Sequence, residues 1–262
     1  MSRWKASAIH AGISILLLAT IAIVMALTWY PPLLAWAGGK MGIVGILFGV
    51  DACLGPLMTL VVFKAGKPGL KVDLGIIALL QVLGMSYGLY VLYEARPVYI
   101  VFAVDRFELV SAVDIPQEAL VKASQVRYQS LPVTGPEIVA AKLPQDSTER
   151  MRLAFSVVKG GPDVHQLPQY YLPYGNMANE AIAKASPLDQ LMGQDGPTRS
   201  KLARWLEKNS RNASSVKCLP LMAAFHELTV LVDSGSGEVL DIVNIIIKPA
   251  STRTTAEPRN GF

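Results

Sequence analysis

Charged residues are scarce in this sequence. They make up 17% of the chain, whereas a soluble domain usually carries about a quarter. Hydrophobic residues make up 52%, and the mean hydropathy is +0.37. This composition is typical of a membrane protein and argues against a wholly soluble one.

Catalytic and metal-binding motifs are also missing. The sequence has no G-x-S-x-G, Walker A, G-x-G-x-x-G or H-E-x-x-H pattern. The histidines are isolated, and the cysteines have neither zinc-binding nor redox spacing. We therefore expect no enzymatic activity, no catalytic residues, no cofactor, no metal site and no disulfide between the two cysteines. The residues concerned are His10, His165, His226, Cys53 and Cys218.

The formal net charge of +4 is distributed unevenly along the chain. Residues 1–96 contain seven Lys or Arg and three Asp or Glu, whereas residues 97–262 contain seventeen of each kind. The second part therefore has no basic excess with which to bind a phosphate backbone, and we do not expect nucleic acid as a partner.

Three long segments are almost free of charge. Residues 6–37 and 74–93 contain no Asp, Glu, Lys or Arg, and residues 41–63 contain only Asp51. Each segment is long enough, as a helix, to cross about 30 Å of hydrocarbon. The sequence thus predicts three transmembrane helices within region 1–96, at about 8–30, 41–63 and 74–93.

A cleaved signal peptide is the alternative for the first segment. Arg3 and Lys5 precede it, and Ala35-Trp36-Ala37 resembles a cleavage site. We favour a retained helix, because apolar cores of signal peptides span about 7–15 residues and this one is longer. Trp29, Tyr30 and Trp36 suit an aromatic belt at the membrane interface.

The distribution of lysines predicts the orientation. Lys64, Lys67 and Lys71 fill the loop between the second and third helices, whereas the first loop has only Lys40. Because positive loops stay in the cytoplasm, the N-terminus and the second loop are expected inside. The protein would then lie in the bacterial inner membrane, with everything after Arg96 in the periplasm.

Residues 97–249 are expected to form a periplasmic α+β domain, followed by a disordered tail at 250–262. The segment 233–237, Asp-Ser-Gly-Ser-Gly, is a strong hairpin signal, and Asp146 is a good helix N-cap. The predicted strands are 98–103, 107–111, 227–232 and 238–247, and the predicted helices are 147–158, 176–184 and 197–211. We expect the basic face of the last helix to be solvated, with contact to anionic lipid as the alternative.

Asp51 stands out because an ionisable group in a membrane helix is costly and often functional. At similar depth the other two helices offer Thr20, Ser86 and Tyr87 as hydrogen-bond partners. The favoured interpretation is that Asp51 holds helices together or binds a partner. A regulatory role and a role in transport are the alternatives, and transport would need a longer polar path.

Small residues mark candidate packing faces on the same helices. Gly45 and Gly49, and likewise Gly84 and Gly88, form G-x-x-x-G patterns, which let helix backbones approach closely. They can pair with each other or with a partner's helix. Pro56 interrupts the second helix, the three lysines suit contact with anionic lipid, and Asp73 suits the start of the third helix.

The run GVDACLGPLMTLVVFKAGKPGLKVDL, together with the segment around ALLQVLGMSYGLYVLYEARPVYIVFAVDRFELVSA, resembles the TfpX/TfpZ family of type IV pilin accessory proteins. The resemblance covers residues 1–111 and returns near the last hairpin. The signature positions are Asp51, Leu54, Gly55, Pro56, Lys64, Gly66, Lys67, Gly69, Lys71 and Asp73.

The resemblance implies an inner-membrane accessory protein that supports type IV pilus assembly or function. Its implied partners are the major type IV pilin, other pilus-assembly proteins and membrane lipid. A membrane-anchored periplasmic sensor or regulator is the alternative, but the predicted cytoplasmic segments are too short for an output domain. A small transporter is a third option, for which the sequence shows no polar path.

Overall fold

The structure is a computed structural model that describes residues 2–192 and 196–247, so the predicted tail at 250–262 lies outside the described residues. The chain divides into two compact units. The first contains the segments up to Val104, Glu108–Tyr174 and Met222–His226. The second contains Asp105–Phe107, Gly175–Leu221 and the chain from Glu227 onward.

The first unit begins with three helices that are long and apolar enough to cross a membrane: α1 Arg3–Thr28, α3 Met41–Val62 and α4 Leu70–Glu94. This confirms the three predicted apolar helices. Both α1 and α4 begin earlier than predicted, because helical hydrogen bonding extends past the apolar run into polar residues. Ser2 caps α1 by accepting from the Lys5 backbone N–H, and Gly69, with φ of 82°, precedes α4.

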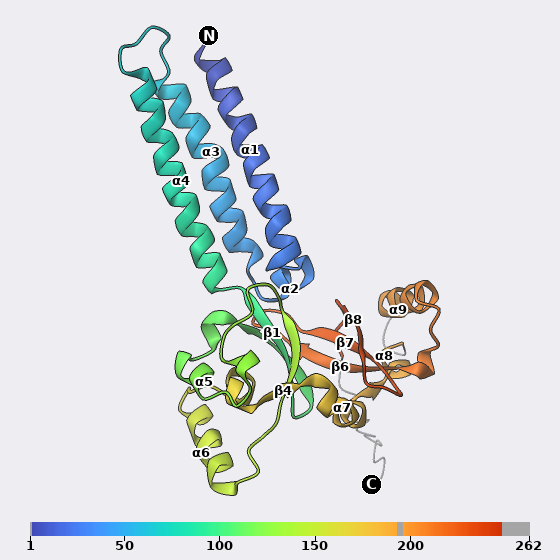
Figure 1. Cartoon of the computed structure of the whole chain (residues 1–262). Helices are drawn as coiled ribbons and strands as arrows, with labels where there is room; N and C mark the ends of the chain where they lie inside the picture. The colour runs from blue at the N-terminus through green and yellow to red at the C-terminus, as the bar shows by residue number, and fades with distance from the viewer. Residues whose placement is uncertain (1, 193–195, 248–262) are drawn as a thin grey trace, which may run out of the picture. The chain divides into compact units, whose positions relative to one another are not determined.

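In the bundle, α3 lies between α1 and α4 and packs against both (Figure 1). Most side chains on the three helices remain exposed and apolar, as lipid-facing surfaces require. A small cluster of Met25, Tyr30, Ala35 and Leu92 closes the end at which α1 finishes. Tyr30 is buried there and donates to the Leu92 carbonyl at 2.7 Å, so it is not part of an exposed aromatic belt.

A short helix that the sequence analysis did not predict, α2 Pro32–Ala37, connects α1 to α3. The backbone N–H groups of Phe225 and His226 both donate to the Ala37 carbonyl, at 3.1 Å. The Trp36 and His226 rings stack with centroids 3.9 Å apart. His226 is therefore a packing residue.

The β-strands of the first unit follow α4 directly. Their order is β4-β3-β1-β2, with β3 parallel to β1 and β4 antiparallel to β3. Their bounds are β1 Pro97–Ala103, β2 Arg106–Ser111, β3 Glu137–Ala141 and β4 Tyr171–Pro173. The strands predicted at 98–103 and 107–111 are confirmed as β1 and β2. Neither β3 nor β4 was predicted, because their short sequences lack a clear alternating pattern.

Two helices flank these strands, α5 Gln117–Val121 and α6 Ser147–Val158. The prediction of α6 is confirmed together with its cap, since the Asp146 carboxylate accepts from the backbone of Thr148 and Glu149. The core beneath them contains three buried tyrosines in edge-to-face contact, Tyr99, Tyr128 and Tyr171. Burial raises the pKa of Tyr99 to about 12.

The second unit contains an antiparallel sheet in which β7 lies between β6 and β8, and β5 pairs with β6. Its elements are α7 Ala178–Lys184, β5 Ser186–Pro187, α8 Leu188–Met192, α9 Gly196–Lys208, β6 Val216–Met222, β7 Leu228–Asp233 and β8 Val239–Val243. The apolar face of α9 contributes Leu202 to a core that also contains Cys218 of β6. Both cysteines are free, with Cys53 exposed and Cys218 buried.

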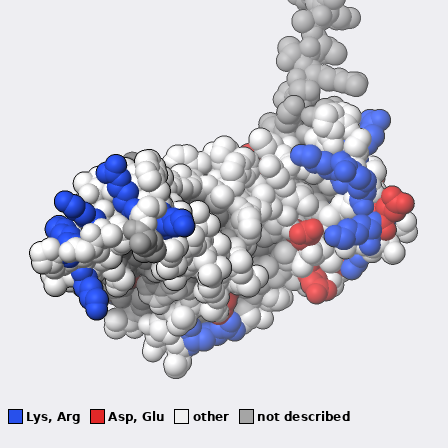
Figure 2. All heavy atoms as spheres, turned by 90° about the horizontal axis from the view of Figure 1, so that it is seen from above, with Lys and Arg blue, Asp and Glu red and all other residues white. Residues whose placement is uncertain are grey.

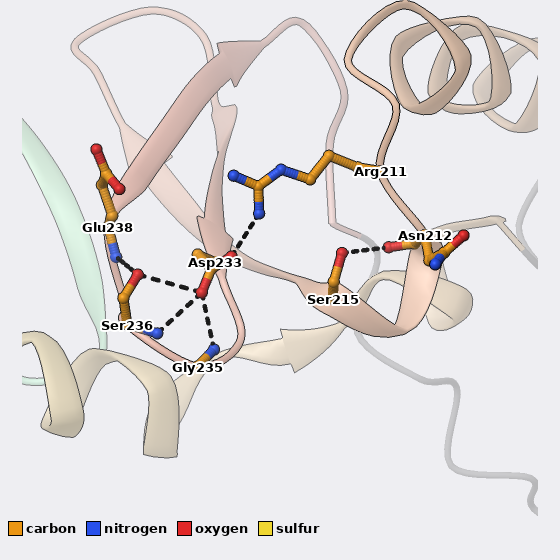
Figure 3. Close-up of polar contacts among 7 residues, drawn as sticks. All are labelled: Arg211, Asn212, Ser215, Asp233, Gly235, Ser236 and Glu238. Carbon is orange, nitrogen blue, oxygen red and sulfur yellow. Dashed lines mark hydrogen bonds and ion pairs between the residues drawn. The ribbon is translucent and has the colours of Figure 1, made fainter.

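The predicted hairpin is confirmed as β7–β8, but β8 ends at Val243 rather than near 247. In the described residues beyond Val243, the chain no longer pairs with β7 through its backbone. The Ile245 carbonyl instead accepts from the side-chain hydroxyl of Thr229 at 2.7 Å. In the turn, the Asp233 carboxylate accepts from Gly235, Ser236 and Arg211 (Figure 3). Six 3₁₀ turns complete the described elements: 112–114, 126–128, 164–166, 168–170, 174–177 and 213–215.

Candidate functional site

Polar side chains from all three long helices meet inside the bundle. His10 of α1 lies with its Nδ1 2.6 Å from the Thr59 hydroxyl of α3 and its Nε2 2.8 Å from the amide oxygen of Gln81 on α4. On the same side, the Ser7 hydroxyl donates to the Pro56 carbonyl at 2.9 Å. One histidine therefore joins three helices, in a setting where each polar group needs a protein partner.

The hydrogen-bond partners of His10 indicate which of its two ring nitrogens carries the proton. An amide oxygen can only accept, so the Nε2 that faces Gln81 must be the donor. In the neutral imidazole, Nδ1 then accepts from the Thr59 hydroxyl. We refer to this linkage of His10, Thr59 and Gln81 as the histidine bridge. No pattern in the sequence indicated this bridge, although His10 is the one histidine within the first apolar segment.

The Gln81 side chain passes close to the backbone of α3 at Gly55 on its way to His10. A Cβ atom placed on Gly55 would lie 2.1 Å from the amide nitrogen of Gln81, which is far too close. The same nitrogen donates to the Asp51 carbonyl at 3.3 Å. Gly55 is thus needed for the close approach of the α4 side chain, which is a physical reason for a glycine at this signature position.

Asp51 lies in the middle of α3, and the residue is only 9% exposed. Its Oδ2 is buried and has no hydrogen-bond partner among residues 2–192 and 196–247. The expected partners do not supply one: Thr20 donates to Leu16 in its own helix, and Ser86 and Tyr87 are exposed. Asp51 therefore does not hold the three helices together through its side chain, and the histidine bridge does so instead.

Asp51 lines two cavities on the surface of the bundle. One, of about 350 Å³, lies between α1 and α4, and its walls include Leu18, Val82 and Ser86. The other, of about 230 Å³, lies between α3 and α4, and we call it the α3–α4 groove. It is lined by Val50, Asp51, Leu54, Gly55, Met58, Ile77, Leu80, Gln81 and Gly84. Both cavities are mainly apolar, with Asp51 and Gln81 as shared polar groups.

The G-x-x-x-G glycines have different surroundings. A Cβ on Gly88 would meet the Leu47 side chain of α3, so this glycine serves packing within the bundle. A Cβ on Gly45, Gly49 or Gly84 would meet nothing within 4 Å, and these three glycines are exposed. The two patterns therefore do not pair with each other, and three of their four glycines leave an open surface.

The loop between α3 and α4 carries the predicted lysines. Lys67 forms an ion pair of 2.6 Å with Asp73 in the first turn of α4, and both side chains are partly exposed. Such a pair contributes about 1 kcal/mol or less. Figure 2, which looks down on this end of the bundle, shows Lys and Arg side chains gathered there. Lys64 and Lys71 belong to the same end.

A third cavity, of about 220 Å³, lies outside the bundle but within the first unit. Glu108, Asp114 and His165 contribute polar groups, and residues 222–224 form another wall. Asp114 accepts from the Ser111 backbone at 2.9 Å and thereby caps a 3₁₀ turn. Among the described residues, no group of three or more His, Cys, Asp or Glu has the arrangement of a metal site.

Three apolar helices followed by a mixed sheet-and-helix domain define a membrane-anchored protein. The chain is 28% identical over 223 residues to the fimbrial assembly protein of serogroup I from Dichelobacter nodosus, covering 84% of this chain and 86% of that protein. The serogroup E1 protein is 26% identical over the same length. The protein of serogroups C1 and C2 is 33% identical over 122 residues, which cover 45% of this chain and 92% of that protein.

The chain therefore belongs to the family of fimbrial assembly proteins. No protein-family profile matches the sequence. No solved structure matches the fold.

Proposed function

We propose that this protein is an inner-membrane accessory protein of type IV pilus assembly that contacts the pilin subunit directly. The three apolar helices cross the membrane, with the N-terminus and the lysine-rich loop in the cytoplasm and the domain after α4 in the periplasm. The lysines of that loop support this orientation, since basic loops remain inside. The similarity to proteins named as fimbrial assembly proteins supports a role of this chain in pilus assembly.

The observation that carries the proposal is the open small-residue surface of the bundle. Gly45, Gly49 and Gly84 lie on membrane-length helices, and a Cβ added to any of them would meet nothing within 4 Å in the described chain. Glycines at such positions permit close approach of another helix. A pilin subunit that waits in the membrane on an apolar helix is a suitable partner, and the periplasmic domain is then positioned to contact the subunit's head.

The test is affinity purification of the tagged full chain from its own host in mild detergent, followed by identification of co-purified proteins. We expect enrichment of the major pilin. Gly45→Leu and Gly84→Leu should each lower the recovered pilin roughly fivefold or more, because a large side chain blocks close helix approach.

The matched control is Gly12→Leu on α1, which is also exposed and has nothing within 4 Å of its added Cβ. It should leave pilin recovery unchanged. A wild-type preparation that recovers no pilin would refute the proposal, as would equal recovery with all three leucine variants.

The cavity of about 220 Å³ that contains Glu108, Asp114 and His165 favours a second candidate, a periplasmic ligand sensor. That function requires a small molecule to bind there. Thermal stabilisation of the full chain by a polar metabolite, lost on filling the cavity with Ala223→Trp, would support it.

A further inference from the structure

Asp51, whose Oδ2 atom has no partner among the described residues, is one of the residues that line the α3–α4 groove. This groove exposes apolar walls on both helices, with Leu54 and Met58 on α3 and Leu80 on α4. Gly84 lies four residues after Leu80 and continues the same helix face without a side chain. The groove is thus a mainly apolar surface whose lining residues include Asp51, the residue with a buried acceptor that has no partner.

The depth of Asp51 limits what can occupy the groove. It lies ten residues into α3, or about 15 Å along the axis from Met41 by helix geometry, which is half of a hydrocarbon core of about 30 Å. A molecule at that depth comes from the bilayer, as an acyl chain or as another membrane helix. An acyl chain has no donor for a carboxyl oxygen, and an unmade hydrogen bond is costly there.

We propose that the α3–α4 groove binds a partner's transmembrane helix that presents a hydrogen-bond donor to Asp51. The inference rests on the proposed function, because the helix is taken to be that of the pilin subunit. A hydroxyl, amide or ammonium group on this helix donates to Asp51, while its neighbouring surface packs on Gly84. The histidine bridge holds α3 and α4 in place and leaves the Asp51 carboxyl available.

The test is site-specific photocrosslinking of the full chain in native membranes. A photoreactive residue replaces Leu80, which lines the groove and is 63% exposed, or Leu79, which is 57% exposed and lines neither bundle cavity. Leu79 and Leu80 are consecutive residues of α4 and therefore point to different sides of the helix. A third probe at Val82 lines the cavity between α1 and α4.

We expect the Leu80 probe to crosslink the pilin subunit and the Leu79 probe to give at least fivefold less product. Asp51→Leu should lower the Leu80 product about threefold to tenfold, the loss expected for one hydrogen bond between membrane helices. Asp51→Asn keeps a carbonyl oxygen as acceptor and should keep more than half of the product. Equal amounts of each variant in the membrane provide the control for folding.

Several outcomes overturn the inference while leaving the proposed function intact, provided that pilin still co-purifies with the wild type. These are equal products from Leu79 and Leu80, a product mainly from Val82, crosslinking to a second copy of this chain or to lipid, and insensitivity to Asp51→Leu. Absence of pilin from both the crosslinked products and the purified sample would instead refute the proposed function itself.

Discussion

The second unit and the helical bundle each contain one aspartate with unusual surroundings, and the two carboxyl groups differ in their hydrogen-bond partners. In the β7–β8 turn, Asp233 accepts from the backbone of Gly235 at 3.0 Å and of Ser236 at 2.9 Å, and Arg211 pairs with its other oxygen (Figure 3). In α3, one oxygen of Asp51 is buried without any donor among the described residues.

The difference shows what each position requires. The turn uses its carboxylate to satisfy backbone N–H groups that the strands leave unpaired, so Asp233 is part of the fold. The bundle is held by the histidine bridge and does not use the side chain of Asp51. A costly group that the fold does not need is best explained by an interaction outside the chain.

The largest effect is expected at Gly55, where an added side chain would collide with the amide group of Gln81. Gly55→Leu should displace the Gln81 amide, break its contacts with His10 and Asp51, and lower the free energy of unfolding by about 1–3 kcal/mol. Gly42→Leu on the same helix has nothing within 4 Å of its Cβ and should leave stability unchanged. Thermal unfolding of the purified full chain in detergent measures both. Equal stability of the two variants would show that the bridge does not support the bundle.

A smaller effect is expected from acid at Asp233. Hydrogen bonds from Ser236 and Gly235, and then the contact with Arg211, lower the pKa of this carboxyl from 3.8 to about 2. The unfolded chain therefore binds more protons between these two values, and the second unit loses stability as the pH falls from about 4 towards 2.

The variant Asp233→Asn isolates this contribution, because it cannot titrate. Its melting temperature should lie below that of the wild type at pH 6, and the gap should narrow as the pH approaches 2. A gap that stays constant with pH would mean that the Asp233 charge does not stabilise the turn.

The smallest effect on stability is expected at Asp51. Asp51→Leu removes a buried acceptor without a partner, so the free energy of unfolding should be unchanged or rise by up to about 1 kcal/mol. The same thermal unfolding assay in detergent applies. A loss above this size would show that the carboxyl group supports the fold, and the contrast with Asp233 would disappear.

Much of the fold could be predicted from local sequence patterns. The long apolar runs predicted the three helices, Asp146 predicted the start of α6, and the Asp-Ser-Gly-Ser-Gly segment predicted the β7–β8 hairpin. Each of these signals lies within a few residues of the element that it specifies. By contrast, β3 pairs in parallel with β1 across more than thirty residues, so no local pattern announces it.

The candidate site was predicted only in part. Asp51 and Gly55 were recognised as unusual, but His10 and Gln81 were not connected with them, and Thr20 and Tyr87 were the wrong partners. Depth along a helix can be estimated by counting residues, whereas the direction of a side chain depends on how each helix is rotated. That rotation follows from packing between helices and not from any one helix's sequence.

The sequence by itself determined that this chain has three membrane-length helices followed by strands and shorter helices, because hydrophobic burial and turn chemistry act locally. Only the tertiary structure decided which polar groups meet. Residues 10, 59 and 81 lie far apart in the chain but converge in the bundle, and Gly55 permits that convergence. The same packing leaves the carboxyl group of Asp51 without a partner, since an acceptor is satisfied only by a donor that the folded helices bring within reach.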